Sequence, residues 1–204
     1  MVNPIELVHE RAALRSAVFI EENCTHASLF ARKVKLHDYV ASQIPPSGLM
    51  MECGVFKGAS INRMAKLHPK RTIYGFDSFE GLSENWPGNH HQKGHFDLGG
   101  VFPIVEDNVV LKKGWVDDTL PSFLKKHKQS IAYLHIDTDT YSPAKTILEL
   151  TKDGFVSGSI VMFDELYGHP NWENNEYKAL TEALPRKKYE YIGFSAMSAA
   201  IRIL

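Results

Sequence analysis

The sequence predicts an α/β protein with a doubly wound, seven-stranded, mostly parallel sheet that ends in a C-terminal antiparallel hairpin. Three observations predict this fold class. Apolar runs typical of buried strands alternate five times with stretches of helical periodicity. The runs are apolar on both faces, as parallel strands covered by helices on both sides require. The last two runs are joined by only four residues, which is too short for a helical crossover, so we expect them to be antiparallel.

The N-terminal quarter of the chain is predicted to be helical. Apolar residues recur at helical spacing over residues 4–22, and a second helix is expected over 28–44, where Pro45 and Pro46 end it. We expect residues 1–47 to pack on a core domain formed by residues 48–204. The first helix is amphipathic, so a homodimer through its apolar face is a further expectation.

The core domain is expected to begin with a strand over 49–53 and to continue in alternation. Predicted strands cover 72–76, 109–116, 131–136, 159–163, 189–194 and 199–204, and predicted helices cover 60–67, 120–126, 143–152 and 172–184. Residues 78–103 have no sustained period and are rich in Gly, Asn, His and aromatic residues. A loop of this length in a compact domain is typically functional, so we expect a lid over a substrate site. Trp86, Phe96 and Trp172 are candidates to line that site or to pack the lid down.

Composition limits the classes of function. The chain has 204 residues, of which 44% are hydrophobic, and a formal net charge of −1. Proteins that bind nucleic acid usually carry a basic face, so this charge balance argues against a nucleic-acid partner. No apolar run reaches the roughly 20 residues that span a bilayer. The N-terminus does not resemble a secretory signal, so we expect a cytoplasmic protein without a membrane partner.

Acidic residues follow the predicted strands of the core domain. In open α/β sheets, ligands bind outside the carboxyl ends of the strands. Unpaired carboxylates that are crowded together repel one another, so a cation or a group rich in hydroxyl donors is expected among them. The polar residues and glycines at these strand ends are Glu52, Gly54, Gly58, Ser60, Asp77, Ser78, Trp115, Asp117, Asp118, Asp137, Asp139, Tyr141, Asp164 and Glu165.

The stretch MECGVFKGAS, residues 51–60, joins the first core strand to its helix. Its spacing, E-x-G-x-x-x-G, differs from the G-x-G-x-x-G of dinucleotide-binding folds, and a glutamate beside a diphosphate would be repulsive. Asp77 follows the next strand, 25 residues after Glu52, and is well placed to accept hydrogen bonds from ribose hydroxyls. A tight turn without a ligand, and an N-cap role for Asp77, are the alternatives at this point.

In five stretches that occur in order, the chain resembles the class I S-adenosylmethionine-dependent methyltransferases: ECGVFKGAS, YGFDSFEGL, GWVDDTLP, LHIDTDTYSP and VMFDELYG. Within that class it is most similar to the macrocin O-methyltransferase-like family, from about residue 48 to the C-terminus. The resemblance implies a Rossmann-like fold and S-adenosylmethionine as cofactor. It places Glu52, Gly54 and Gly58, here called the glycine corner, at the methionine moiety of the cofactor. It places Asp77 at the ribose, and Trp115 with Asp117 at the adenine. The expected cofactor-binding residues are Glu52, Gly54, Gly58, Ser60, Asp77, Ser78, Trp115, Asp117 and Asp137.

A second acidic cluster predicts a divalent metal. Adjacent parallel strands lie about 4.8 Å apart, so acids at the ends of strands 131–136 and 159–163 can converge. Mg²⁺ prefers oxygen ligands of this kind. The resembling family uses such acids for a metal, which implies Asp137, Asp164 and Glu165 as ligands here, although that family more often has Asp-Asp at the last two positions. Solvated strand ends with capping acids are the alternative.

Methyl transfer from this cofactor is an in-line displacement at the sulfonium methyl group. The cofactor supplies a good leaving group, so the protein mainly aligns donor and acceptor. A hydroxyl acceptor becomes nucleophilic when its proton leaves, and Asp139 and His95 are the candidate catalytic bases. We expect Mg²⁺-assisted O-methylation of a small molecule, such as a sugar or a phenolic metabolite. A nicotinamide-dependent oxidoreductase and a non-catalytic cofactor-binding protein are the alternatives.

Overall fold

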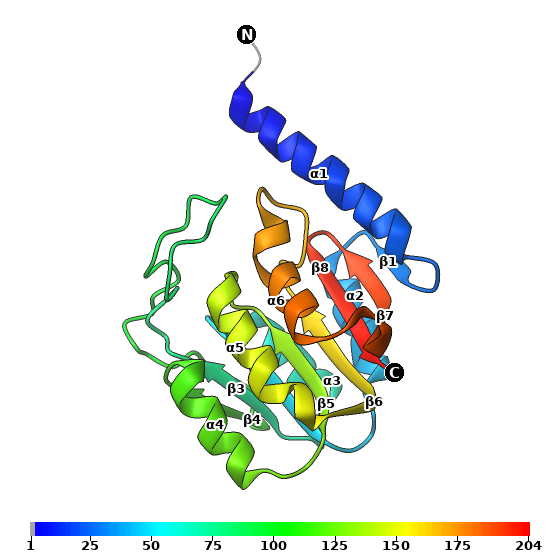
Figure 1. Ribbon diagram of the computed structural model, residues 1–204. Helices are drawn as coiled ribbons and strands as arrows, with labels where there is room; N and C mark the ends of the chain where they lie inside the picture. The colour runs from blue at the N-terminus through cyan, green and yellow to red at the C-terminus, as the bar shows by residue number, and fades with distance from the viewer. Residues whose placement is uncertain (1–2) are drawn as a thin grey trace.

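One mixed sheet of eight strands forms the centre of the computed structural model, which describes residues 3–204 (Figure 1). The strands are β1 (Ser28–Phe30), β2 (Leu49–Cys53), β3 (Ile73–Asp77), β4 (Val109–Lys113), β5 (Ile131–Ile136), β6 (Phe155–Phe163), β7 (Tyr189–Ser195) and β8 (Ser198–Ile203). They lie in the order β1-β7-β8-β6-β5-β2-β3-β4. Strand β8 pairs antiparallel with β6 and β7, and the other pairs are parallel. The predicted fold class is therefore confirmed, with one strand more than expected.

Helices cover both faces of the sheet. They are α1 (Pro4–Asn23), α2 (Lys33–Gln43), α3 (Ala59–Leu67), α4 (Val116–Lys126), α5 (Tyr141–Thr151) and α6 (Glu176–Ala183), with 3₁₀ turns at Lys152–Gly154, Trp172–Asn174 and Arg186–Lys188. Helices α2 and α3 lie on one face and α4, α5 and α6 on the other (Figure 1). The apolar residues of the two groups of helices belong to two separate core clusters. This three-layer arrangement buries β2, β5 and the second half of β6, which explains their uninterrupted apolar character.

The helix predicted over 28–44 is wrong in its first part. Residues Ser28–Phe30 form β1, which pairs in parallel with β7 and adds the eighth strand at the edge of the sheet. Helix α2 begins only at Lys33, after Arg32 in an extended conformation. Backbone pairing with an available sheet edge thus overrides the local helical pattern, as tertiary context commonly does.

A predicted strand and a predicted helix have other boundaries in the structure than expected. In each case a glycine or an asparagine with a positive φ lies at the point of difference. The strand predicted over 109–116 ends at Lys113, because Gly114 has a φ of +137° and α4 starts two residues later. The helix predicted over 172–184 is divided into the 3₁₀ turn Trp172–Asn174 and α6, with Asn171 in a left-handed conformation before them.

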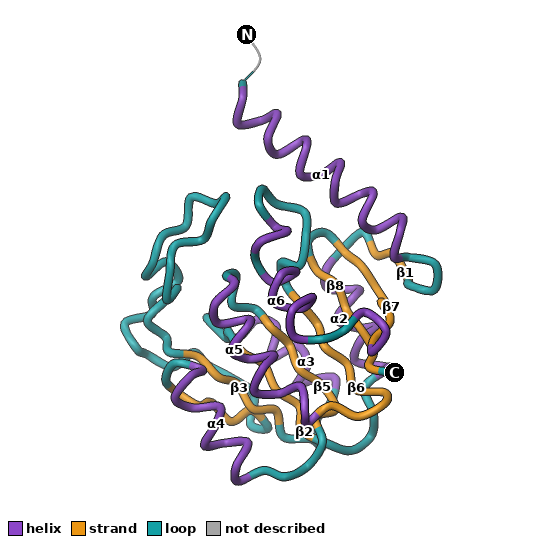
Figure 2. Tube along the Cα trace, in the orientation of Figure 1, coloured by secondary structure: helices purple, strands orange, loops and turns teal. Residues whose placement is uncertain are grey.

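Helix α1 contacts the body of the protein along a narrow stripe. Its buried residues are Ala12, Ser16 and Phe19, and Figure 2 shows its N-terminal half extending beyond the sheet. Large apolar side chains on α1 are exposed: Ile5, Leu7, Val8, Leu14 and Val18. Residues 1 and 2 of the predicted segment 1–47 lie outside the described residues. Within the described part of the chain, no helix is both long enough and apolar enough to cross a bilayer.

Candidate active site

A cavity of about 600 Å³ opens at the carboxyl ends of β2, β3, β4, β5 and β6. The residues that follow these strands line it, together with part of the long loop 78–103 and the start of α5. This is the edge at which doubly wound sheets bind their ligands, because the connections diverge there and leave a crevice. Six of the predicted cofactor-binding residues line the cavity: Gly54, Asp77, Ser78, Trp115, Asp117 and Asp137.

The lining of the cavity is strongly acidic. Among the described residues, it contains six carboxylates and no lysine or arginine. The six are Asp77, Asp117, Asp137, Asp139, Asp164 and Glu165. So many carboxyl groups favour a cationic ligand, which would stabilise their ionised forms, over an anionic one.

Glu52, Gly58 and Ser60 do not line the cavity. Side chains alternate along β2, so Met51 and Cys53 pack on the α4–α6 face, whereas Glu52 points to the α2–α3 face. There Glu52 is buried, accepts a hydrogen bond from Ser60 Oγ at 2.8 Å, and lies 3.0 Å from Nδ1 of His135. Glu52 therefore contacts Ser60 and His135 rather than the cavity.

The structure shows why glycine occupies positions 54 and 58 of the glycine corner, for reasons that the sequence pattern did not reveal. Gly54 has a φ of +88°, and a Cβ atom there would lie 1.7 Å from the carbonyl oxygen of Asp137. Only glycine allows the end of β2 to pack so closely against the end of β5. Gly58 has a φ of +81° and is the residue before α3, where the left-handed conformation favours glycine. At Gly54 the close neighbour is therefore the backbone of Asp137.

Asp77 holds the glycine corner in place. Its Oδ2 accepts the backbone N–H groups of Val55 at 2.7 Å and Phe56 at 2.8 Å, and its Oδ1 accepts that of Phe79 at 2.7 Å. Each carboxylate oxygen can accept about two hydrogen bonds. Oδ1 of Asp77 therefore keeps one acceptor position for a ligand in the cavity.

The three predicted metal ligands converge. Asp137, Asp164 and Glu165 each offer an oxygen, and these atoms lie within 4.8 Å of one another. Among the described residues, Oδ1 of Asp164 and Oε2 of Glu165 are buried without a hydrogen-bond partner. An all-oxygen cluster with unsatisfied acceptors fits Mg²⁺.

Burial and mutual repulsion perturb this acidic cluster. Burial, followed by the charge of Asp164, raises the pKa of Asp137 and of Glu165 well above the usual range. Burial also opposes ionisation of Asp164, but His135 and the ammonium of Lys33, which contacts Oδ2, outweigh it and lower the pKa of Asp164. One carboxylate is thus firmly ionised in the metal-free protein, and its neighbours hold their protons more tightly than usual.

Of the two candidate bases, Asp139 faces the cavity and His95 does not. Asp139 is 8% exposed, and burial, followed by the charge of Asp164, raises its pKa to about 7. Its φ of +63° is uncommon for a residue other than glycine and is often found at functional sites. His95 is exposed in the loop 78–103, where its ring stacks on that of His91 with centroids 3.8 Å apart.

The loop 78–103 contributes to the cavity through fewer aromatic residues than expected. Phe96 lines the cavity, as do Gly81, Leu82 and Ser83. Trp86 instead packs against His169, with ring centroids 5.5 Å apart. Trp172 packs against Phe19 of α1 and Tyr177 of α6. For both tryptophans the packing alternative is the one observed.

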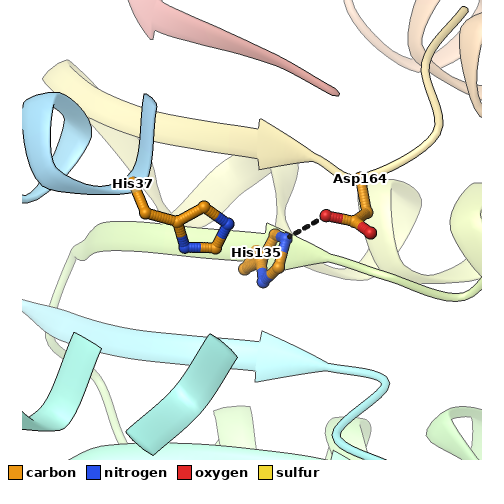
Figure 3. Close-up of side chains that lie close together, drawn as sticks. All are labelled: His37, His135 and Asp164. Carbon is orange, nitrogen blue, oxygen red and sulfur yellow. Dashed lines mark ion pairs between the residues drawn. The ribbon is translucent and has the colours of Figure 1, made fainter. Parts of the chain in front are cut away.

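Sequence reasoning missed a set of buried polar residues behind the cavity. His37 of α2 and His135 of β5 lie beside Asp164 (Figure 3). Glu176 of α6 is buried beside Glu165, and the backbone N–H of Glu165 donates to Oε2 of Glu176 at 3.2 Å. Burial and the neighbouring charge of His135 lower the pKa of His37 to about 3. Burial opposes the charge on His135, but Asp164 and Glu52 raise its pKa to about 10. The signal available in the sequence was a histidine inside the apolar run IAYLHI.

The parallel sheet with one reversed strand, the glycine corner and the acid-lined cavity together define a class I S-adenosylmethionine-dependent methyltransferase. The chain belongs to the Methyltransf_24 family, described as a methyltransferase domain, which matches residues 51–166. The alternatives of a nicotinamide-dependent oxidoreductase and a non-catalytic binding protein find no support in this match. Among proteins with curated descriptions, none matches the chain.

Solved structures of methyltransferases share the fold. CalS11, a calicheamicin methyltransferase, is 27% identical over 83% of this chain and 77% of its own, with a TM-score of 0.70. The O-methyltransferase NovP is 18% identical over 84% of this chain and 79% of its own, with a TM-score of 0.59. MycE, from the mycinamycin biosynthetic pathway and solved with Mg and SAH, is 12% identical over 83% of this chain but 48% of its own, with a TM-score of 0.51.

Proposed function

We propose that the protein transfers the methyl group of S-adenosylmethionine to a hydroxyl oxygen of a small molecule, with assistance from Mg²⁺. The observation that carries this proposal is the cavity of about 600 Å³ lined by six carboxylates. S-adenosylmethionine carries a sulfonium and an ammonium group, and both are attracted by such a lining. A volume of this size suits a small ligand.

The cofactor is proposed to bind the six predicted residues that line the cavity. Asp77 would accept a ribose hydroxyl at the free position of Oδ1, and Trp115, which is 36% exposed at the cavity, would stack on the adenine. Glu52 and Ser60 would act indirectly, since their hydrogen bond ties β2 to the start of α3. Gly58 would contribute through the geometry of the same corner.

The metal is proposed to bind Asp137, Asp164 and Glu165. Their converging oxygens and the two unsatisfied acceptors support this assignment. When bound, Mg²⁺ would lower the pKa of an acceptor hydroxyl and orient its oxygen. Lys33 would release Oδ2 of Asp164, which would then bind the ion.

Asp139 is proposed to be the catalytic base. Its carboxylate would take the hydroxyl proton as the oxygen attacks the methyl carbon and the carbon–sulfur bond breaks. A pKa of about 7 suits proton transfer near neutral pH. The loop 78–103 would exclude water, and its Glu84 anchors it to α5 by accepting hydrogen bonds from the N–H and Oγ of Ser142 at 3.1 and 2.9 Å.

The acceptor is proposed to be a sugar or a phenolic metabolite. The similarity to CalS11, which is described as a TDP-rhamnose 3′-O-methyltransferase, supports a sugar hydroxyl. We further propose that residues 1–47 pack as a unit on the domain 48–204, and that the exposed apolar residues of α1 pair two copies in a homodimer. A cytoplasmic location and the absence of a nucleic-acid partner complete the proposal.

Calorimetry with S-adenosylhomocysteine, with and without Mg²⁺, tests the cofactor and metal assignments. We expect micromolar binding, and NAD⁺ in the same cell serves as the matched control that should not bind. A screen of nucleotide sugars and phenols with methyl-labelled cofactor then tests the acceptor class. Absence of S-adenosylhomocysteine binding at millimolar concentration would refute the proposal, and label transferred to amines but not to hydroxyls would refute O-methylation.

A further inference from the structure

Three buried side chains meet behind the cavity: His37 from α2, His135 from β5 and Asp164 after β6 (Figure 3). Each offers one ligand atom, and these atoms lie within 4.8 Å of one another. The side chains are 3%, 0% and 3% exposed. Within residues 3–204, no hydrogen-bond partner reaches either ring nitrogen of His37, Nε2 of His135 or Oδ1 of Asp164. Nε2 of His135 and Oδ1 of Asp164 form only a long ion pair, and the nitrogens of His37 have no partner, so a further group bound here would satisfy buried polar atoms that are otherwise costly.

Glu52 determines which nitrogen of His135 faces this cluster. Oε2 of Glu52 lies 3.0 Å from Nδ1 of His135 and, as a carboxylate oxygen, accepts the proton of that nitrogen. The other nitrogen, Nε2, faces Oδ1 of Asp164, 3.5 Å away, and can carry a proton or bind a metal ion. Without a metal the protonated ring is favoured, since Asp164 and Glu52 raise the pKa of His135. A hydrogen bond from the second ring nitrogen to a carboxylate is also the contact that metal-binding histidines commonly make.

A metal ion would bind more of the unpartnered atoms in this cluster than a proton would. A proton on Nε2 of His135 serves only the pair with Asp164, across a distance that is long for a hydrogen bond. Both nitrogens of His37 would remain without a partner. A metal ion accepts a lone pair from each of the three residues. We propose that His37, His135 and Asp164 bind one divalent transition-metal ion of the Zn²⁺ type.

The donor set determines the kind of metal. Two imidazole nitrogens and one carboxylate suit Zn²⁺, Co²⁺, Ni²⁺ or Fe²⁺, whereas Mg²⁺ prefers oxygen ligands alone. The site therefore differs in preference from the oxygen cluster of Asp137 and Glu165, although both use Asp164. Lys33 contacts Oδ2 of Asp164 and leaves Oδ1 for the ion. Because its ligands come from α2, β5 and the end of β6, the ion would join the helix layer to the sheet.

Titration of the full chain with Co²⁺ tests this site, because the visible absorption of Co²⁺ reports on nitrogen ligands. After chelator treatment and dialysis, the wild-type protein is expected to bind one Co²⁺ with an intense visible band, which Zn²⁺ removes and excess Mg²⁺ does not. The variant Asp137→Asn, which alters only the oxygen cluster, should keep the band. The variant His37→Gln should weaken Co²⁺ binding at least tenfold.

Each result that contradicts the proposal shows what occupies the cluster of His37, His135 and Asp164 instead. A wild-type protein without the band would show that the cluster holds a proton only. A band that His37→Gln keeps and Asp137→Asn loses would place the ion in the oxygen cluster. If His37→Gln does not fold, proton NMR of the Co²⁺-loaded wild type decides instead: two exchangeable, paramagnetically shifted imidazole N–H signals are expected, and their absence overturns the proposal. Binding of S-adenosylhomocysteine is measured separately, so failure here leaves the proposed function standing.

Discussion

Oδ2 of Asp77, at the end of β3, accepts the backbone N–H of Val55 at 2.7 Å and so joins the ends of two neighbouring strands. The same oxygen accepts the N–H of Phe56, which lines the cavity. The carboxylate thus shapes the cofactor side of the cavity before any ligand arrives. Asp77 supports the turn, as one of the two alternatives from the sequence expected, and it lines the cavity in which the cofactor is proposed to bind.

The variant Asp77→Asn is expected to weaken the binding of S-adenosylhomocysteine by about 10- to 100-fold, or about 1.5–3 kcal/mol. The physical reason is that an amide lacks the charge of the carboxylate and turns one NH₂ group toward N–H donors. Calorimetry measures the affinity, and thermal denaturation measures the accompanying loss of stability. The control is Asp118→Asn, because Asp118 is exposed on α4; this variant should bind S-adenosylhomocysteine with normal affinity. Unchanged affinity in Asp77→Asn would remove Asp77 from the cofactor site.

Removal of the metal is expected to abolish turnover and to spare the cofactor. Excess chelator should reduce methyl transfer at least about 100-fold, since a metal contributes several kcal/mol of stabilisation in such reactions. Glu165→Gln, which removes one charge from the oxygen cluster, should require more Mg²⁺ for half-maximal activity. Activity assays across a Mg²⁺ series, alongside calorimetry with S-adenosylhomocysteine, provide the measurement. Full activity of Glu165→Gln in chelator would show that no catalytic metal binds there.

The rate should depend on the ionisation of Asp139. A base must be unprotonated, and burial raises the pKa of Asp139 to about 7, so kcat is expected to rise as the pH increases through about 7 and then to level off. Asp139→Asn should lower kcat by about 10²–10⁴ and remove the rising limb. The measurement is a pH–rate profile of both proteins, with His95→Ala as the comparison that keeps the profile. A normal profile in Asp139→Asn would exclude it as the base.

Glu176 is expected to make stability fall as the pH rises. Its side chain is 0% exposed, and burial, followed by the charges of Asp139 and Asp164, raises its pKa from 4.5 to about 8. The folded protein therefore binds more protons than the unfolded chain between these values, and stability is lost as the pH rises from about 4.5 to about 8.

Glu176→Gln lacks this titration, so its free energy of unfolding should exceed that of the wild type increasingly across the same range, by roughly 2–4 kcal/mol at pH 8. Urea denaturation at pH 5, 6.5 and 8 gives the difference. Glu10→Gln, an exposed position on α1, should track the wild type. Parallel curves for the wild type and Glu176→Gln would contradict the assignment.

Strand ends were predictable from the sequence because they depend on local patterns. Buried parallel strands are apolar runs, and the residues that follow them must lie at one edge of the sheet, which brings Asp137, Asp164 and Glu165 together. The strand β1 was not predictable, because three residues gain their structure only by pairing with the edge of β7. The direction of Glu52 was missed for a related reason, since the face toward which it points depends on the register of β2.

The buried partners of the site were harder still to predict. His37 and His135 are 98 positions apart in the sequence, and only the packing of α2 against the sheet brings them together. The position of His95 could not be predicted because the path of a long loop does not follow from periodicity; the structure places it at the surface and outside the cavity lining.

The missing β-carbon of Gly54 has a consequence for how this enzyme could diversify. Gly54 packs on the backbone of Asp137, and the N–H of Asp137 donates to the carbonyl of Cys53 at 2.9 Å, so the proposed donor and metal halves of the cavity are held together. We therefore expect different acceptors to be accommodated mainly by the loop 78–103, which lines the cavity and lies outside the sheet. Relatives with other acceptors should therefore differ most in that loop while keeping the same corner.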